Sequence, residues 1–286
     1  MIKKKLIIGT ANFKNKYGIG NSRVSISSIK KILKYTKEKK LNYFDTSEKY
    51  KDIISDMPEN SMVNIKFFFN KKWENFDYAL KQLKNIKKKN KKLNINSIMF
   101  HDTKILFSTM GSLIFKNLLI LKKKKLFKKI GVSIYDYREL SFLLKNFKID
   151  IVQCPFSILD RRLVISGWLR KLSIKKIEVH ARSVFFQGLL VNDKLFTNKY
   201  FHKWHSKFSR WFKYLKMNGI KPVDVCLSYV LKHNIDKVVL GVDDINHLIS
   251  LINFKKEKKL KKFSYMKCNN NLLIDTRKWT HIWKNE

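Results

Sequence analysis

The chain contains 286 residues, 44% of them apolar, and its 62 Lys and Arg residues against 22 Asp and Glu residues give a formal net charge of +40. This length and apolar fraction allow one sizeable core, since barrels of parallel strands reach roughly 250 residues as a single domain. No run approaches the roughly 20 apolar residues of a membrane-spanning helix, and the first residues do not resemble a secretory leader. We therefore expect one domain and no membrane segment.

The positive charge is nearly all lysine, which bears on whether nucleic acid is a partner. Arginine occurs at only eight positions, whereas proteins that read nucleic acids usually rely on arginine for bidentate contacts. Alanine, proline and glycine, whose codons are GC-rich, are rare, while lysine, asparagine, isoleucine and phenylalanine are abundant. An AT-biased genome explains this pattern best. We expect loose binding of polyanions and no specific nucleic-acid partner.

The three cysteines are sparse and far apart. Cys154, Cys226 and Cys268 show no metal-ligand spacing. An odd, scattered set of this kind is typical of reduced thiols in the cytoplasm. We therefore predict a cytoplasmic protein without a metal site.

Short apolar runs alternate with longer amphipathic segments along almost the whole chain. The apolar runs are too continuous for burial on one face, which favours strands covered on both faces. We predict eight such strands, at Leu6–Thr10, Asn42–Thr46, Val63–Phe68, Ser97–His101, Lys129–Ser133, Asp150–Gln153, Ile177–Ala181 and Lys237–Gly241.

The lysine-rich segments between the strands have helical periodicity. Apolar residues recur at helical spacing in two of them, namely Ile26, Ile29, Ile32 and Leu33 in one, and Leu113, Leu118 and Leu121 in the other. Asp136 is expected to cap a helix that runs to Asn146, with Glu139 in a capping-box position. Pro222 is expected in the first turn of a helix that runs through His233.

Eight strand–helix units predict an α/β fold, a closed (β/α)8 TIM barrel. An open doubly wound sheet is the alternative, but Gly9–Phe13 is not the Gly-rich turn that such a sheet carries after its first strand. No linker divides the chain, so we expect a single domain over residues 1–286. Asn192–Lys216 is expected to add a helix over the barrel, and the tail from about residue 255 to pack on it.

Polar residues end nearly all of the predicted strands. In barrels of this kind the active site lies at the carboxyl ends of the strands, so these residues are expected to share one site. They are Thr10, Asp45, Lys66, His101, Ser133, Gln153 and Arg182, with Gly241 as the apolar member.

Four residues in or near this set could reduce a carbonyl group. Tyr50 could give a proton to the carbonyl oxygen if a cation such as Lys66 lowered its pKa. Asp45 could hold that lysine, and His101 could hydrogen-bond the same oxygen. Each also has an ordinary structural interpretation, such as a loop aromatic, a surface lysine or a capped strand end.

The segment Asp45-Thr46-Ser47-Glu48-Lys49-Tyr50 resembles the Asp-Thr-Ala-x-x-Tyr segment of the aldo/keto reductases. Lys66 and His101-Asp102 then end the third and fourth predicted strands, in that family's order. The other matching segments are Gly9-Thr10-Ala11-Asn12-Phe13, Tyr17-Gly18-Ile19, Gly131-Val132-Ser133, Asp150-Ile151-Val152-Gln153, Leu159-Asp160-Arg161-Arg162, His180-Ala181-Arg182-Ser183, Gln187-Gly188-Leu189-Leu190 and Ile274-Asp275-Thr276-Arg277-Lys278-Trp279. Each motif is weak alone, but the ordered set covers nearly the whole chain.

The resemblance implies an oxidoreductase that uses NADP(H) or NAD(H) on a small aldehyde or ketone, with a sugar-like compound as one candidate. Tyr50 would be the general acid, Lys66 and Asp45 its tuning pair, and His101 the substrate-orienting group. Ser133 and Gln153 would bind the nicotinamide carboxamide, and backbone groups at 183–190 and 241–244 the phosphates and adenosine. The implied cofactor residues are Gly9, Thr10, Ser133, Gln153, Arg182, Ser183, Gly241 and Asp244, and the candidate aromatic wall residues are Phe13, Tyr17, Phe69 and Trp73.

Three departures from the family pattern keep an alternative open. Lys51 stands where glycine commonly follows the catalytic tyrosine, and Arg182 stands where many members stack an aromatic ring. Asp243 and Asp244 would repel a 2′-phosphate if they pointed inward, or could cap a helix instead. The alternative is an inactive barrel that serves as a binding or scaffold protein. The intact set of four catalytic positions favours the enzyme, while cofactor preference, substrate and oligomeric state stay open.

Overall fold

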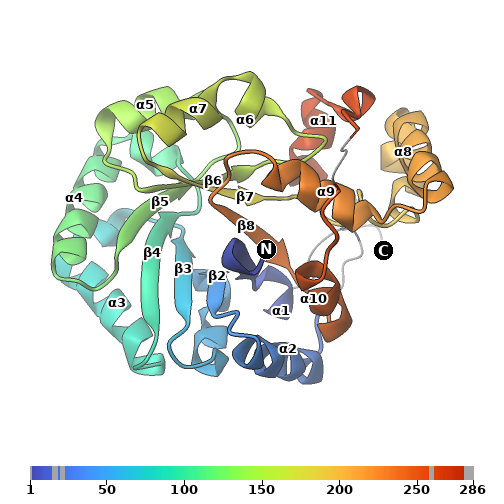
Figure 1. Ribbon diagram of the computed structural model, residues 1–286. Coiled ribbons are helices and arrows are strands. Elements are labelled where there is room, and N and C mark those ends of the chain that lie inside the picture. Colours follow the sequence, from blue (N-terminus) through green and yellow to red (C-terminus); the bar gives the residue numbers. More distant parts are fainter. Residues whose placement is uncertain (1, 15–18, 20–22, 258–260, 280–286) are drawn as a thin grey trace.

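The computed structural model describes residues 2–14, 19, 23–257 and 261–279. Eight parallel strands form a closed barrel in chain order, and β1 pairs with β8 from Leu6–Val238 to Gly9–Gly241 to close it (Figure 1). The strands are β1 Leu6–Gly9, β2 Tyr43–Ser47, β3 Met62–Phe67, β4 Asn94–Phe100, β5 Lys129–Ser133, β6 Ile151–Pro155, β7 Glu178–Arg182 and β8 Lys237–Gly241. The predicted (β/α)8 barrel and its eight strands are confirmed, with small shifts at some strand ends.

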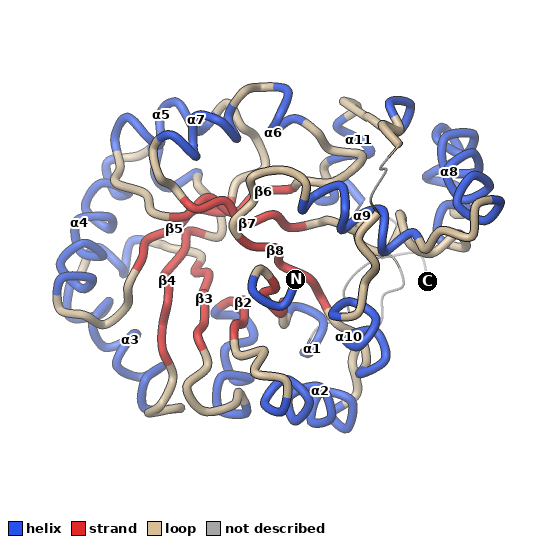
Figure 2. Tube along the Cα trace, viewed as in Figure 1, coloured by secondary structure: helices blue, strands red, loops and turns tan. Residues whose placement is uncertain are grey.

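Helices surround the strands as an outer layer (Figure 2). The α-helices are α1 Ala11–Lys14, α2 Ile26–Glu38, α3 Phe76–Lys89, α4 Thr109–Lys123, α5 Glu139–Asn146, α6 Arg162–Ile165, α7 Trp168–Ile174, α8 His205–Met217, α9 Pro222–Leu231, α10 Ile245–Ile252 and α11 Asn271–Ile274. The 3₁₀ segments are η1 Ile2–Lys4, η2 Glu48–Asp56, η3 Lys71–Glu74, η4 Lys104–Phe107, η5 Leu195–Thr197, η6 Lys199–Trp204, η7 Ser264–Met266 and η8 Thr276–Trp279. None of the described helices is long and apolar enough to cross a membrane.

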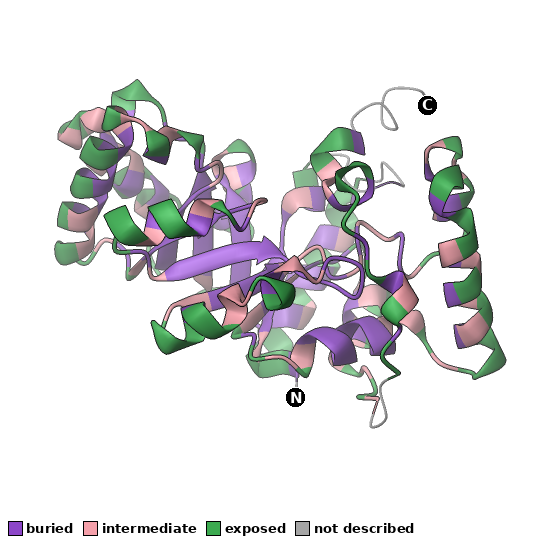
Figure 3. Ribbon diagram, turned by 90° about the horizontal axis from the view of Figure 1, so that it is seen from above, coloured by how far each residue is buried: buried purple, intermediate pink, exposed green. Residues whose placement is uncertain are grey.

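The helices bury one face against the strands and expose the other (Figure 3). In α2 the predicted face is largely correct, but Ile26, in the first turn, is 68% exposed. In α4, Leu113 is 43% exposed. That prediction was wrong because Leu113 and Leu118 are five residues apart, about 140° around a helix. Ile114, four residues before Leu118, is buried instead.

The predicted cap at Asp136 was also wrong, because α5 begins three residues later, at Glu139. The Asp136 carboxylate instead accepts a hydrogen bond from the backbone N–H of Arg138 and pairs with its guanidinium. The Glu139 carboxylate accepts a hydrogen bond from the Thr103 hydroxyl, so it does not close a capping box. Pro222, by contrast, begins α9 as predicted.

The segment between β7 and α9 adds a helix outside the ring, as predicted for Asn192–Lys216. This helix, α8, stands apart from the barrel helices at one side of the molecule. Trp211 anchors it, since its ring is buried and its indole N–H donates to the carbonyl oxygen of Leu190 at 3.0 Å. The helix is thereby fixed to the loop that follows β7.

The described part of the C-terminal segment packs against the barrel loops. The Arg161 guanidinium donates to the carbonyl oxygen of Phe263 at 2.6 Å. The backbone N–H of Cys268 donates to the carbonyl oxygen of Leu159 at 3.0 Å. Trp279 is fully buried, with its ring 5.5 Å from that of Phe186 in the loop after β7.

The barrel interior contains a buried polar cluster that the sequence analysis did not predict. Asn64 Oδ1 accepts hydrogen bonds from the Tyr43 hydroxyl at 3.1 Å and the Ser97 hydroxyl at 2.7 Å, and Asn96 joins the same group. Asn64 Nδ2 lies 3.5 Å from His180 Nδ1, across the barrel from β3 to β7. Burial raises the pKa of Tyr43, so its hydroxyl stays a neutral donor. The strands thus gain specific polar contacts below the site.

Candidate active site

A cavity of about 710 Å³ lies at the carboxyl ends of the strands. This volume is within the range of small-molecule sites. All four predicted catalytic residues line it, and so do seven of the eight predicted cofactor residues. They are Asp45, Tyr50, Lys66, His101, Gly9, Thr10, Ser133, Gln153, Arg182, Ser183 and Gly241. The strands therefore bring together residues that are up to about 230 positions apart in the chain.

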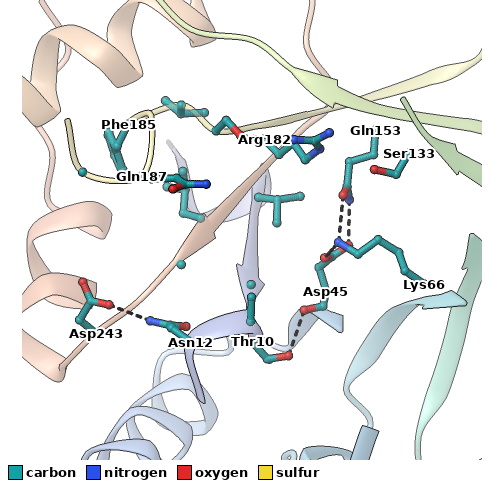
Figure 4. A pocket seen from close by; sticks show the side chains of 18 of the residues that line it. Thr10, Asn12, Asp45, Lys66, Ser133, Gln153, Arg182, Phe185, Gln187 and Asp243 are labelled. Atoms are coloured by element: carbon teal, nitrogen blue, oxygen red, sulfur yellow. Dashed lines mark hydrogen bonds and ion pairs between the residues drawn. The ribbon is translucent and has the colours of Figure 1, made fainter. Parts of the chain in front are cut away.

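A buried ion pair forms the floor of the cavity. Lys66 from β3 pairs with Asp45 from β2, and their side chains are only 10% and 4% exposed. Gln153 from β6 completes the group: its Oε1 accepts from Lys66 Nζ at 3.0 Å and its Nε2 donates to Asp45 Oδ2 at 2.8 Å (Figure 4). A buried pair needs such additional hydrogen bonds to offset its lost hydration. The amino group of this lysine is thus held in a fixed place.

Gln153 and Ser133 were expected to hydrogen-bond a nicotinamide carboxamide together. One N–H of the Gln153 amide and one lone pair of its oxygen are used by the ion pair, which leaves its second N–H and second lone pair. The Ser133 hydroxyl, at the end of β5, has no hydrogen-bond partner among the described residues and lines the cavity. The side chain of Ser133 is therefore the less engaged member of that predicted pair.

Tyr50 lies in the segment that follows β2. Ser47 caps the start of η2 by accepting a hydrogen bond from the backbone N–H of Lys49 at 3.2 Å. Tyr50 interrupts η2 with φ −134° and ψ 29°, and its side chain is buried where it lines the cavity. Lys51 is not among the residues with positive φ. The backbone here therefore does not require the glycine that the family commonly has at this position.

His101 follows β4 and is held by an aromatic ring. The Phe68 ring stacks on its imidazole with 4.2 Å between ring centroids. Its Nδ1 is buried without a partner in the described part of the chain. Burial, aided by the charge of Lys66, lowers the pKa of His101 to about 3. The imidazole is therefore neutral at physiological pH and donates a single N–H.

The depressed pKa of His101 predicts a loss of stability in acid. The pKa is about 3 in the folded protein against an ordinary value of 6.5. Protons therefore bind the unfolded chain first, and the contribution of His101 is lost as the pH falls from about 6.5 toward 3. When the pH falls from 7 to 5, we expect the free energy of unfolding of the wild type to decrease by about 1–2 kcal/mol more than that of a His101→Gln variant. Urea unfolding of both proteins measures this, and equal losses would contradict the burial described.

A loop of unusual backbone shape forms another part of the cavity. Between Ser183 and Gly188, four residues have left-handed φ, and Gly188 has the most positive value at 95°. Turns of this kind can aim backbone N–H groups that are not used within the loop at an anion. Nearby, Gln187 Oε1 and Asn12 Oδ1 are buried without partners among the described residues. These atoms line the same cavity, which indicates a polar ligand there.

The two carboxylates after β8 have separate roles. Asp244 does not line the cavity: it caps α10 and accepts from the backbone N–H of His247 at 2.8 Å. The start of α10 turns this side chain away from the cavity, and the place of Asp244 in the cofactor site stays a prediction. Asp243 does line the cavity and accepts from Asn12 Nδ2 at 2.7 Å. Hydrogen bonding from His247 and Asn12 lowers its pKa, so Asp243 is charged.

The aromatic wall also differs from the prediction. Phe13, Phe69 and Trp73 do not line the cavity. Phe69 and Trp73 instead pack in the core, with ring centroids 4.7 Å apart. Tyr17 lies outside the described residues. Besides Tyr50 and His101, the aromatic residues that line the cavity are Phe68, Tyr135 and Phe185.

The sequence analysis missed several polar residues of the cavity. Lys49 and Asn12 lie inside segments that carry the family resemblance, but no role was assigned to them. Gln187 precedes Gly188 in another such segment. Proximity to the matched motifs was the only available signal, since side-chain direction in loops does not follow a simple period.

Comparison with known proteins identifies the family of this chain. The sequence model of the aldo/keto reductase family matches residues 5–270. A glycerol dehydrogenase from Gluconobacter oxydans has a similar structure, with a TM-score of 0.69 and 14% identity over 99% of this chain and 97% of that one. A thermostable aldo-keto reductase, solved with the inhibitor epalrestat, has a TM-score of 0.63 and 16% identity over 91% of this chain and 93% of that one. Among curated proteins no relative matches. The structural likenesses, at these identities, concern the fold alone.

Proposed function

Because the chain belongs to the aldo/keto reductase family, a family of oxidoreductases, we propose that it is an NAD(P)H-dependent enzyme that reduces an aldehyde or a ketone to an alcohol. The observation that carries this proposal is the buried Lys66–Asp45 pair at the floor of a cavity also lined by Tyr50 and His101. A buried cation beside a tyrosine and a neutral histidine is suited to proton donation and oxyanion stabilisation.

The polar groups of the cavity suit a nicotinamide dinucleotide. The unpartnered oxygens of Asn12 and Gln187 and the free hydroxyl of Ser133 could bind its amide and sugar groups. Gly241 leaves room for it, since the nearest atom to an added Cβ would be Asn12 Oδ1 at 4.0 Å. The backbone of the Ser183–Gly188 loop could hold its phosphates. When bound, the reduced nicotinamide supplies the hydride.

The side chains supply the proton and orient the carbonyl group. Tyr50 would donate its phenolic proton to the carbonyl oxygen of the substrate. Lys66 stabilises the phenolate left behind, and Asp45 with Gln153 holds the lysine in place. His101, which is neutral, donates an N–H to the same oxygen and thereby positions the substrate. Phe68 and Tyr135 line the cavity.

The first test is cofactor binding by the purified protein. Titration with NADH and NADPH at moderate salt, followed by cofactor fluorescence, should show saturable binding of at least one. Binding that survives higher salt is specific, whereas binding that fades with salt is the general response of a +40 protein to polyanions. A protein that binds neither cofactor would contradict the proposal and favour an inactive barrel.

The three free, buried cysteines suit a reducing compartment, so we propose the cytoplasm as the location of the protein.

Asp243 is expected to set the cofactor preference. Its charged side chain faces the cavity and would repel an additional phosphate. We therefore expect the wild type to bind NADH more tightly than NADPH, and Asp243→Asn to reduce that preference by about fivefold, or about 1 kcal/mol. The two dissociation constants of each protein measure this. Equal tightening of both cofactors would place Asp243 beside the pyrophosphate they share, and no change in either dissociation constant would remove it from the phosphates altogether.

A further inference from the structure

The charged side chains that line the cavity are not all paired. Lys66 is paired with Asp45, and Asp243 lies against Asn12 and His247. Lys49 and Arg182 also line the cavity, but neither has a carboxylate partner within the described part of the chain. The end of the cavity that holds the catalytic groups therefore carries two uncompensated positive charges.

Lys49 lies next to the residues that would hold the substrate carbonyl. Its ammonium is 4.5 Å from the centroid of the Phe68 ring, and that ring stacks on His101. The nearest acidic neighbour in the chain, Glu48, is used elsewhere, because its carboxylate accepts from the backbone N–H of Phe68 at 2.8 Å. Asp102, beside His101, accepts from the backbone N–H of Lys104. Lys49 is exposed and flexible, so it can reach a group on a bound molecule.

Arg182 is fixed at the end of β7. Its guanidinium carbon lies 4.0 Å above the Tyr135 ring and its Nη2 donates to the carbonyl oxygen of Ile134 at 3.0 Å. A second guanidinium, that of Arg277, contacts the same ring but is paired with Asp275. After burial and the charge of Lys66, the charges of Arg182 and Lys49 also contribute to the low pKa of His101. The positive charges of Arg182 and Lys49 therefore affect the electrostatic potential near His101, where the carbonyl oxygen would lie.

We propose that the substrate of this enzyme is an anionic carbonyl compound, whose carboxylate or phosphate group is held by Lys49 in the field of Arg182. This inference rests on the proposed reductase function and names the class of its substrate. A half-enclosed cavity concentrates the field of its wall charges, which favours a ligand of the opposite sign. Lys49 follows β2, whereas the loops assigned to the cofactor phosphates follow β7 and β8, so Lys49 is free for the substrate.

The test compares three aldehydes of similar size. 4-Carboxybenzaldehyde and 4-formylphenyl phosphate carry an anion, and methyl 4-formylbenzoate is neutral. We expect kcat/KM for at least one anionic probe to exceed that of the ester by about fivefold, which is the scale of a partly exposed ion pair. Lys49→Gln should bring this ratio close to one, and Lys49→Glu should reverse it. The better anionic probe distinguishes a carboxylate from a phosphate, and raised salt should reduce the preference.

Lys71→Gln is the matched control, because Lys71 is an exposed lysine of η3 that does not line the cavity. Its ratio should equal that of the wild type. Three results would overturn the inference and leave the reductase function standing: a wild-type ratio near one, an equal fall in both glutamine variants, or weaker NADH binding by Lys49→Gln. Reduction of none of the probes by the wild type would contradict the proposed function and the inference with it.

Discussion

Tyr50→Phe is expected to lower kcat by about 10²- to 10⁴-fold, the usual contribution of a positioned general acid. The substitution removes only the phenolic hydroxyl, so the buried ring and the shape of the cavity are kept. The cofactor dissociation constant should therefore change by less than about twofold. Steady-state reduction of an aldehyde and fluorescence titration with the cofactor measure the two quantities separately.

Tyr35→Phe is a suitable control for this experiment. Tyr35 lies on α2 and does not line the cavity, and its substitution likewise removes a single hydroxyl. It should retain wild-type turnover. If Tyr50→Phe also retained wild-type turnover, Tyr50 would not be the general acid. If it lost cofactor binding to the same extent as turnover, its hydroxyl would bind the cofactor rather than transfer the proton.

The fold was predictable from the sequence because strand burial on both faces leaves a simple pattern. Runs such as Leu6–Gly9 are short, apolar and continuous, and the segments between the strands have helical spacing. The cavity followed from the same prediction. Parallel strands place all their carboxyl ends at one face, so residues such as Asp45, Lys66 and Gln153 had to meet once the strands were known.

The directions of individual side chains were not predictable in the same way. Asp243 and Asp244 are adjacent carboxylates, and only the start of α10 decides which one faces the cavity. Phe68 and Phe69 are adjacent aromatic residues just after β3, and the first lines the cavity whereas the second lies in the core. In both pairs a shift of one residue reverses which side chain faces the cavity. Loop positions cannot be predicted from the sequence to within one residue.

The Lys66–Asp45 pair leads to the second large expected effect, on stability. Lys66→Met should lower the free energy of unfolding by about 3–5 kcal/mol, because it leaves the Asp45 carboxylate buried without its cation. Urea unfolding measures this loss. The exposed pair Lys92–Glu59 is the matched control, with side chains 61% and 62% exposed. Lys92→Met should cost less than about 1 kcal/mol.

A double variant separates the structural role of this pair from its chemical role. Lys66→Met combined with Asp45→Asn removes both charges, so the cost of an unpaired buried carboxylate disappears and most of the lost stability should return. Turnover should not return, since no cation remains to stabilise the Tyr50 phenolate. Recovery of turnover with stability would mean that the pair only supports the barrel. A Lys66→Met protein as stable as the wild type would instead contradict the burial of the pair.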